Sequence, residues 1–162
     1  METLHYSIDK IASLIGARKY GEGSAIVDWL LTDSRSLAFP EVTLFFALRT
    51  RLGDGHRYIA SLYKRGVRSF VVEHLPADYA NYPGAHFLVV TNSLKALQRL
   101  AERHREAHNL PVIGITGSNG KTVVKEWLYQ ILSPSKNVTR SPRSYNSQIG
   151  VPLSVWLLDE GS

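Results

Sequence analysis

The chain of 162 residues is 44% hydrophobic and 20% charged, an ordinary globular composition with enough apolar material for one domain, or for one small domain and part of another. Its net charge of +5 is spread along the sequence, which disfavours nucleic acid as a partner and suits small anionic substrates. No apolar run is long enough to cross a membrane, no signal peptide is recognisable and cysteine is absent, so we expect a cytoplasmic protein without disulfides or membrane insertion.

The first predicted elements are a short helix and a buried strand. Ser7 can cap a helix that ends at Gly16, and its apolar face would consist of Ile8, Ile11, Leu14 and Ile15. Residues 25–31 predict a strand, which is followed by the polar residues Thr32, Asp33, Ser34 and Arg35. Because open α/β sheets bind ligands at the carboxyl ends of their strands, this cluster is a candidate site. The alternative is a simple Asx or Ser turn after a strand.

A second strand and a second helix are expected after this cluster. Residues 42–48 predict the strand, and a polar loop over 49–56 follows it. Asp54 is a suitable cap for a helix that runs through Lys64 and ends at Gly66. Its inward side would consist of Ile59, Leu62 and Tyr63.

Two further strands and a long helix complete the first part of the chain. The strands are predicted over 67–72 and 86–90, and Ser93 can cap a helix over 94–107. Strands that alternate with helices at this spacing predict a mostly parallel α/β sheet. His104 and His108 lie four residues apart and could share a metal, but the residues between them fit neither zinc-protease motif. We therefore do not expect a metal site there.

A phosphate-binding pattern follows the break at 109–111, Asn-Leu-Pro, which marks the predicted domain boundary. Val112, Ile113 and Ile115 predict a strand, residues 116–120 form a glycine loop, and after Lys121 and Thr122 apolar residues recur at helical spacing, which predicts a helix. Backbone N–H groups of such a loop and the positive end of the helix dipole hold an anion. The expected apolar side of the helix comprises Val124, Trp127, Leu128, Ile131 and Leu132.

The residues of the loop suggest ATP and Mg²⁺ as cofactors. Lys121 would reach the β- and γ-phosphates and the Thr122 hydroxyl would ligate Mg²⁺. The cradle itself would be Gly117, Ser118, Asn119 and Gly120. The strict pattern has a further glycine where this chain has Ile115, so the alternative is an ordinary βα turn that contains Gly-Lys-Thr.

The final segment, residues 145–157, predicts a turn and a short helix. It reads YNSQIGVPL over 145–153, and Pro152 suits the first turn of a helix that carries Leu153, Trp156 and Leu157.

Three motifs together resemble those of the Mur ligase family. Residues 116–122, TGSNGKT, are similar to the family's ATP loop, which tolerates an apolar residue in place of the first glycine. The series Asp33-Ser34-Arg35, Pro40, a Leu-Phe-x-Ala-Leu strand and Asp54-Gly55-His56 resembles the family's N-terminal uridine-nucleotide domain, with Glu41 and Arg49-Thr50 as departures. Residues 146–152 resemble a second signature, of which only Asn146 and the Ile-Gly-Val-Pro tail carry over.

The resemblance implies an α/β architecture of two parts. Residues 1–108 would form a small N-terminal α/β domain that binds UDP-MurNAc-peptide through Thr32, Asp33, Ser34 and Arg35. Residues 109–162 would begin a P-loop α/β domain that binds ATP, in which Lys121 and Thr122 are catalytic and Asn146 lies toward ATP and the acceptor. The residues Val123-Val124-Lys125-Glu126 resemble the branch that joins D-Ala-D-Ala to UDP-MurNAc-tripeptide through an acyl phosphate in peptidoglycan synthesis.

Several alternatives remain open at this point. A related branch of the family adds a diamino acid instead, and a non-catalytic nucleotide-binding module would keep the same loops. A P-loop motor acting on nucleic acid is disfavoured by the even charge. On the resemblance, we expect the chain to be an N-terminal fragment, monomeric and inactive as a ligase alone.

Overall fold

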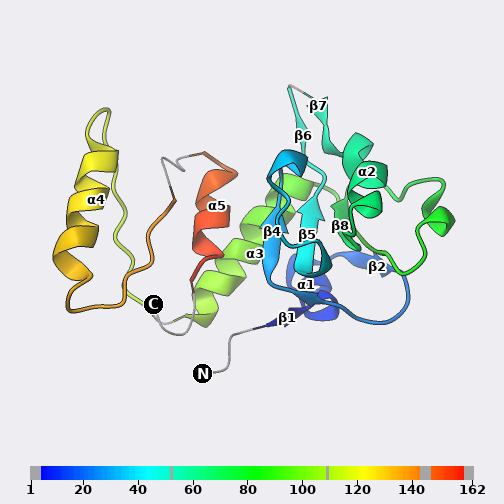
Figure 1. Cartoon of the computed structure of the whole chain (residues 1–162), viewed down its shortest axis with the longest axis horizontal. Coiled ribbons are helices and arrows are strands. Elements are labelled where there is room, and N and C mark those ends of the chain that lie inside the picture. The colour runs from blue at the N-terminus through cyan, green and yellow to red at the C-terminus, as the bar shows by residue number, and fades with distance from the viewer. Residues whose placement is uncertain (1–4, 52, 109, 143–146, 159–162) are drawn as a thin grey trace. The chain divides into compact units, whose positions relative to one another are not determined.

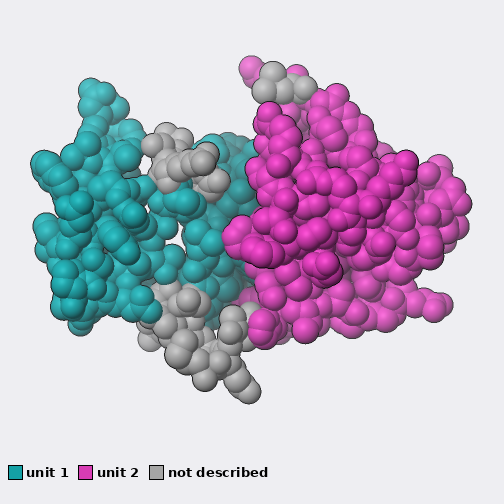
Figure 2. Space-filling view, in the orientation of Figure 1, with its two compact units in different colours: residues 1–4, 101–162 teal, residues 5–100 magenta. Residues whose placement is uncertain are grey.

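The computed structural model describes residues 5–51, 53–108, 110–142 and 147–158. The chain divides into two compact units, which Figure 2 shows in different colours. Residues 5–100 form one of them, here called the sheet unit, and the residues from 101 onward form the other, here called the loop unit. The division falls within helix α3 (Ser93–Ala107). The domain boundary expected at residue 108 therefore stays a prediction.

The sheet unit is built on five strands in the order β2-β9-β8-β5-β4 (Figure 1). Four of them run parallel to one another: β4 (Trp29–Leu31), β5 (Thr43–Phe46), β8 (Ser69–Val72) and β9 (His86–Val89). This confirms the mostly parallel α/β sheet. The fifth strand, β2 (Arg18–Tyr20), pairs antiparallel with β9 at one edge and was not predicted, because its residues show no apolar alternation.

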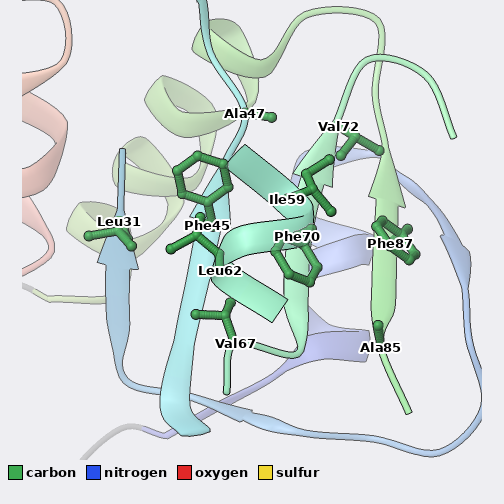
Figure 3. Close-up of a cluster of buried hydrophobic side chains, with 10 residues drawn as sticks. All are labelled: Leu31, Phe45, Ala47, Ile59, Leu62, Val67, Phe70, Val72, Ala85 and Phe87. Atoms are coloured by element: carbon green, nitrogen blue, oxygen red, sulfur yellow. The ribbon is translucent and has the colours of Figure 1, made fainter. Parts of the chain in front are cut away.

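Strand register places three aromatic rings side by side in the core. Phe70 lies opposite Phe45 on one neighbouring strand and opposite Phe87 on the other. The Phe70 and Phe87 rings stack with centroids 5.4 Å apart, and Phe45 meets Phe70 edge-on at 6.5 Å. Ile59 and Leu62 of helix α2 (Ile59–Lys64) belong to the same buried cluster, which Figure 3 shows. Such aromatic pairs add about 0.5–1.5 kcal/mol each beyond their buried area.

The opposite face of the sheet is also buried. Side chains alternate along a strand, so Leu44, Phe46 and Leu88 point away from the aromatic cluster, and all three are fully buried. Helices α1 (Ile8–Ile15) and α3 likewise bury apolar side chains, Ile8, Ile11, Leu97 and Leu100. A parallel sheet needs cover on both faces, and these residues agree with that requirement.

The helix caps are partly as predicted. The Ser7 hydroxyl accepts the Lys10 N–H at 3.1 Å, and Gly16 ends α1 in the left-handed conformation at φ 67°. At α3, however, the Asn92 Oδ1 accepts the Lys95 N–H at 2.8 Å, so Asn92 caps the helix and the prediction of Ser93 was wrong. Ser93 is fully buried, and its own N–H donates to Glu73 Oε1 at 3.0 Å.

The strand predicted over 25–31 is in fact two strands. β3 (Ile26–Val27) pairs antiparallel with β1 (Tyr6–Ser7), whereas β4 joins the main sheet beside β5. Asp28 separates them, and its N–H donates to the Val42 carbonyl at 3.0 Å. The apolar composition of residues 25–31 predicts a single strand because it carries no information about which strand each half pairs with.

The region after β5 is more structured than the predicted loop. β6 (Arg49–Thr50) and β7 (Gly53–Asp54) form a small antiparallel hairpin. Asp54 caps a 3₁₀ turn, η3 (Gly55–Tyr58), and the helix that was expected from Asp54 begins only with α2. Three further 3₁₀ turns are η1 (Ser34–Ser36), η2 (Pro40–Val42) and η4 (Tyr79–Asn81).

The loop unit contains the end of α3 and the helices α4 (Lys121–Leu132) and α5 (Gly150–Val155). Both later helices lie where helices were predicted, but α5 ends at Val155, before Trp156 and Leu157, which were expected to belong to it. The strand expected over 112–115 is not formed: Val112 and Ile113 are 63% and 62% exposed, and no described segment pairs with them. A strand depends on a neighbour for its hydrogen bonds, which an apolar run cannot supply alone.

Helix α4 exposes most of its predicted apolar side. Trp127 and Ile131 are 61% and 70% exposed, and Val124 is 41% exposed.

Within the described ranges, no helix has both the length and the apolar character that crossing a membrane requires.

Candidate functional site

The polar cluster after β4 folds into a tight turn. Asp33 caps η1, and its Oδ1 accepts the Arg35 N–H at 3.0 Å, which is an Asx turn. The Arg35 guanidinium then donates to both oxygens of the same carboxylate, from Nε to Oδ1 at 2.9 Å and from Nη2 to Oδ2 at 2.7 Å. Hydrogen bonds from the Arg35 side chain and backbone hold the pKa of Asp33 below its usual value.

The same turn is anchored to the end of α2. The Ser34 carbonyl accepts a hydrogen bond from Arg65 Nη1 at 2.7 Å. Thr32, Asp33 and Ser34 are half-buried, whereas the Arg35 side chain is 88% exposed. A fixed turn therefore presents a guanidinium at the carboxyl end of β4. Its predicted role in substrate binding stays a prediction.

A second polar network, which the sequence did not reveal, centres on His56. The His56 Nε2 accepts the Glu73 N–H at 2.9 Å, so the ring proton must be on Nδ1. Nδ1 lies 2.5 Å from Asp54 Oδ1 and donates to it. The two contacts fix the neutral tautomer of this imidazole and join the β6–β7 hairpin to the end of β8.

Asp54 and Glu73 extend this network on either side. Burial opposes ionisation of Asp54, but hydrogen bonds from the His56 backbone and ring and from Arg49 Nε, at 3.1 Å, outweigh it and hold its pKa well below the usual range. Arg49 Nη1 also lies 3.8 Å from Glu73 Oε2. Because Glu73 accepts the N–H of Ser93, the hairpin is linked to the start of α3 as well.

The close backbone contacts around Gly55 explain why a glycine stands between Asp54 and His56. Its N–H donates to the Leu48 carbonyl at 2.8 Å, which draws the turn against β5's end. A Cβ at this position would lie 2.8 Å from the Leu48 nitrogen and 3.0 Å from the Ala47 carbonyl carbon. Both are backbone atoms, so a larger residue would displace the turn that carries the Asp54 and His56 side chains.

A shallow cavity beside this network is too small for a nucleotide. Its volume is about 170 Å³, below the roughly 300–1,000 Å³ of ordinary ligand pockets. His56 and His74 line it with their rings stacked 4.2 Å apart, and Tyr82 lies on another side. Both His56 nitrogens are already hydrogen-bonded, so this imidazole has no free donor or acceptor for a ligand.

The candidate phosphate loop lies at the start of α4. Gly117 and Gly120 have φ values of 148° and 79°, and Gly120 is the helix cap in the left-handed conformation. Ser118, Asn119 and Thr122 are exposed. The first N–H groups of a helix lack partners within it, so those after Gly120 are suited to an anion. The Lys121 Nζ donates to the Gly117 carbonyl and so lies across the loop.

The other candidate residues are placed as follows. Asn146 lies outside the described residues. His104 and His108 are both buried, with their ring donors bonded to the carbonyls of Leu158 and His104 respectively. In the described part of the chain, no three His, Cys, Asp or Glu side chains are grouped in a way that could hold a metal ion.

Comparison with known families and curated proteins gives a consistent result. Residues 115–161 match the Mur ligase middle domain. The UDP-N-acetylmuramoyl-tripeptide--D-alanyl-D-alanine ligase of Synechocystis sp. is 38% identical over 126 residues, which are 78% of this chain and 27% of that protein. The UDP-N-acetylmuramoyl-L-alanyl-D-glutamate--2,6-diaminopimelate ligase of Chlorobaculum tepidum is 31% identical over 134 residues, 79% of this chain and 26% of that protein.

Solved structures agree with the sequence relatives. MurF from Acinetobacter baumannii superposes with a TM-score of 0.85 at 25% identity, over 99% of this chain and 35% of that one. MurF from Thermotoga maritima in complex with ADP gives a TM-score of 0.66 at 26% identity, over 79% and 28%. The chain thus spans about a quarter to a third of the length of these proteins.

Proposed function

We propose that the chain is part of a Mur ligase and that it serves the ATP-dependent joining of D-Ala-D-Ala to UDP-MurNAc-tripeptide. The proposal is carried by the Gly117–Thr122 loop at the start of α4, within the region that matches the family's middle domain. Relatives that are named for this activity, and a solved relative in complex with ADP, support it. Because the chain spans only part of these relatives, activity, substrates and partners are all proposals here.

We propose that the loop holds ATP and Mg²⁺. Backbone N–H groups after two glycines, an ammonium and a hydroxyl are the donor set that a metal–triphosphate requires. When bound, Mg²⁺ and ATP supply the phosphoryl group that converts a carboxylate into an acyl phosphate. Lys121 would exchange the Gly117 carbonyl for phosphate oxygens and stabilise the charge that develops during transfer. The Thr122 hydroxyl would ligate the metal ion.

The sheet unit would bind the UDP end of the substrate. Arg35 is the proposed diphosphate contact, supported by Thr32, Asp33 and Ser34, since this guanidinium lies exposed at the carboxyl end of a parallel strand. The carboxylate of Asp33 already orients the guanidinium before any ligand is present. Residues 1–108 and 109–162 would then be the substrate-binding domain and the start of the ATP-binding domain. We also propose a cytoplasmic monomer.

Calorimetry with Mg²⁺ and ATP on the 162-residue chain tests the loop. Lys121→Ala should weaken binding about tenfold or more, because a charge-assisted hydrogen bond contributes roughly 1.5–3 kcal/mol. Lys136→Ala, which removes an exposed lysine beyond α4, should change nothing. If the Lys121→Ala variant and the parent chain bound ATP equally well, the loop would be an ordinary βα turn and the proposed ATP site would be wrong. In the whole ligase, Lys121→Ala should abolish turnover and spare UDP-substrate binding.

Titration with UDP tests the cluster after β4. Arg35→Ala should weaken binding, whereas Arg103→Ala, which removes another exposed arginine paired with a carboxylate, should not. An unchanged affinity for UDP in Arg35→Ala would remove the cluster from the site.

A second candidate activity is the addition of a diamino acid, which the similarity to the Chlorobaculum tepidum ligase favours. Both activities would use the same loop and the same substrate end. The acceptor amine that supports ATP hydrolysis by the whole ligase separates them, D-Ala-D-Ala in one case and a diamino acid in the other.

A further inference from the structure

Helix α5 is held against the end of α3 by a buried histidine. His104 is 3% exposed, and its Nε2 donates to the Leu158 carbonyl at 3.0 Å. Its ring centroid also lies 4.7 Å from that of Trp156, which is 9% exposed. Both partners come from the turn that ends α5. The Leu158 carbonyl lies just beyond the last turn of α5, and His104 supplies the N–H donor for it.

A second histidine supports the first. The His108 Nδ1 donates to the His104 carbonyl at 2.8 Å, and the two rings lie 4.5 Å apart. The His108 Nε2 is buried without a hydrogen-bond partner.

A positively charged side chain lies beside this pair. Arg105 donates from its guanidinium to the carbonyls of His108 and Leu110, at 3.1 and 3.3 Å. Residues 150–158 of α5 and its final turn contain no acidic or basic side chain. Of the nearby carboxylates on α3, Glu106 pairs with Arg103 at 2.7 Å, and Glu102 is exposed.

We propose that His104 is a positioning residue that fixes α5, and with it the Gly150–Pro152 turn, as long as its ring is neutral. The docking of α5 does not depend on the proposed function. Protonation of His104 would bury a charge beside His108 and Arg105, so acid should release α5 from α3.

The direction of the pH dependence follows from the burial of the ring. Burial lowers the pKa of His104 below its ordinary value of 6.5, and the neighbouring His108 lowers it further. The hydrogen bond to Leu158 acts in the opposite direction but does not outweigh the burial. A released His104 regains the ordinary value and binds a proton more readily than the docked one. Docking is thus fully present above pH 6.5 and is lost as pH falls through the lowered pKa. Between the two values, release should increase about tenfold per pH unit.

Trp156 itself can report the release. The chain has three tryptophans, and the other two, Trp29 and Trp127, are 37% and 61% exposed. In a Trp29→Phe, Trp127→Phe background, Trp156 emission should be blue-shifted at pH 8, and should weaken and shift to the red as pH falls below 6.5. His104→Gln keeps an N–H donor for Leu158 without a titrating ring, so its emission should stay blue-shifted to a lower pH. His104→Leu should be red-shifted throughout.

His86→Gln is the matched control, because His86 is another buried histidine but lies in the sheet unit. It should leave the titration unchanged. The proposal is overturned if the transition persists unaltered in His104→Gln, or if Trp156 emission does not change between pH 8 and 5. If the tryptophan variants do not fold, amide exchange of residues 150–158 in the unsubstituted chain and in His104→Gln gives the same decision. Neither readout involves nucleotide, so its failure leaves the proposed function standing, and the reverse also holds.

Discussion

Replacing His56 by phenylalanine should destabilise the sheet unit through two lost hydrogen bonds. Phenylalanine keeps a ring of similar size against His74 but can neither donate to Asp54 nor accept from the Glu73 N–H. The contact with an ionised carboxylate contributes about 1.5–3 kcal/mol, and an unsatisfied buried N–H costs about 1–3 kcal/mol. Asp54 is 40% exposed and regains water, so the sum is reduced to about 2–4 kcal/mol.

Two conservative variants separate the contacts. His56→Asn offers an N–H near the position of Nδ1 and should restore the contact with Asp54, whereas His56→Gln offers an oxygen near Nε2 and should restore the contact with Glu73. Each should recover about half of the loss. Urea unfolding, followed by Trp29 emission with Trp127 and Trp156 replaced by phenylalanine, measures the free energy. At a slope of about 2 kcal/mol per M, in the middle of the usual range for urea, the His56→Phe midpoint should fall by about 1–2 M. A fall below about 0.3 M, or equal losses in all three variants, would refute the network.

Three further predictions concern the same unit. Asn92→Ala should destabilise it by about 1 kcal/mol because it removes the α3 cap, whereas Ser93→Ala should be nearly neutral, and thermal unfolding of the pair decides between the two caps. Gly55→Ala should cost about 1–3 kcal/mol because its Cβ meets backbone atoms, and a urea midpoint equal to that of the parent chain would contradict this. The low pKa of Asp54 adds stability that is present above its usual pKa of 3.8 and is lost as pH falls below it, so in Asp54→Asn the acid sensitivity between pH 5 and 2 should decrease.

Local signals in the sequence predicted the helices well. The caps of α1, the glycine that opens α4 and the position of Pro152 in α5 all depend on residues within one or two turns of each other. Such short-range patterns can be read directly from the chain. The parallel character of the sheet was also predictable, because it follows from the alternation of strands with helices.

The features that were missed depend on residues far apart in the sequence. The pairing of β2 with β9 joins residues 18–20 to 87–89. The His56 network depends on the backbone N–H of Glu73, and no sequence motif indicates that Glu73 lies near His56. The split at Asp28 has the same origin, since its two halves pair with different strands. In the candidate site, the loop at Gly117–Thr122 was recognisable as a motif, whereas the ion pair between Arg35 and Asp33 is evident only from the structure.

The order of the strands has a consequence for how the chain folds as it is synthesised. All five strands of the main sheet lie within residues 18–89, so every backbone pairing in that sheet can form before the segment of α4 leaves the ribosome. Several apolar side chains of α4, in contrast, stay exposed in the described part of the chain, namely Val123, Val124, Trp127 and Ile131. Nascent chains from which residues up to 120 have left the ribosome should therefore already protect the sheet against protease, while longer ones that expose Trp127 and Ile131 should bind chaperones that recognise apolar segments.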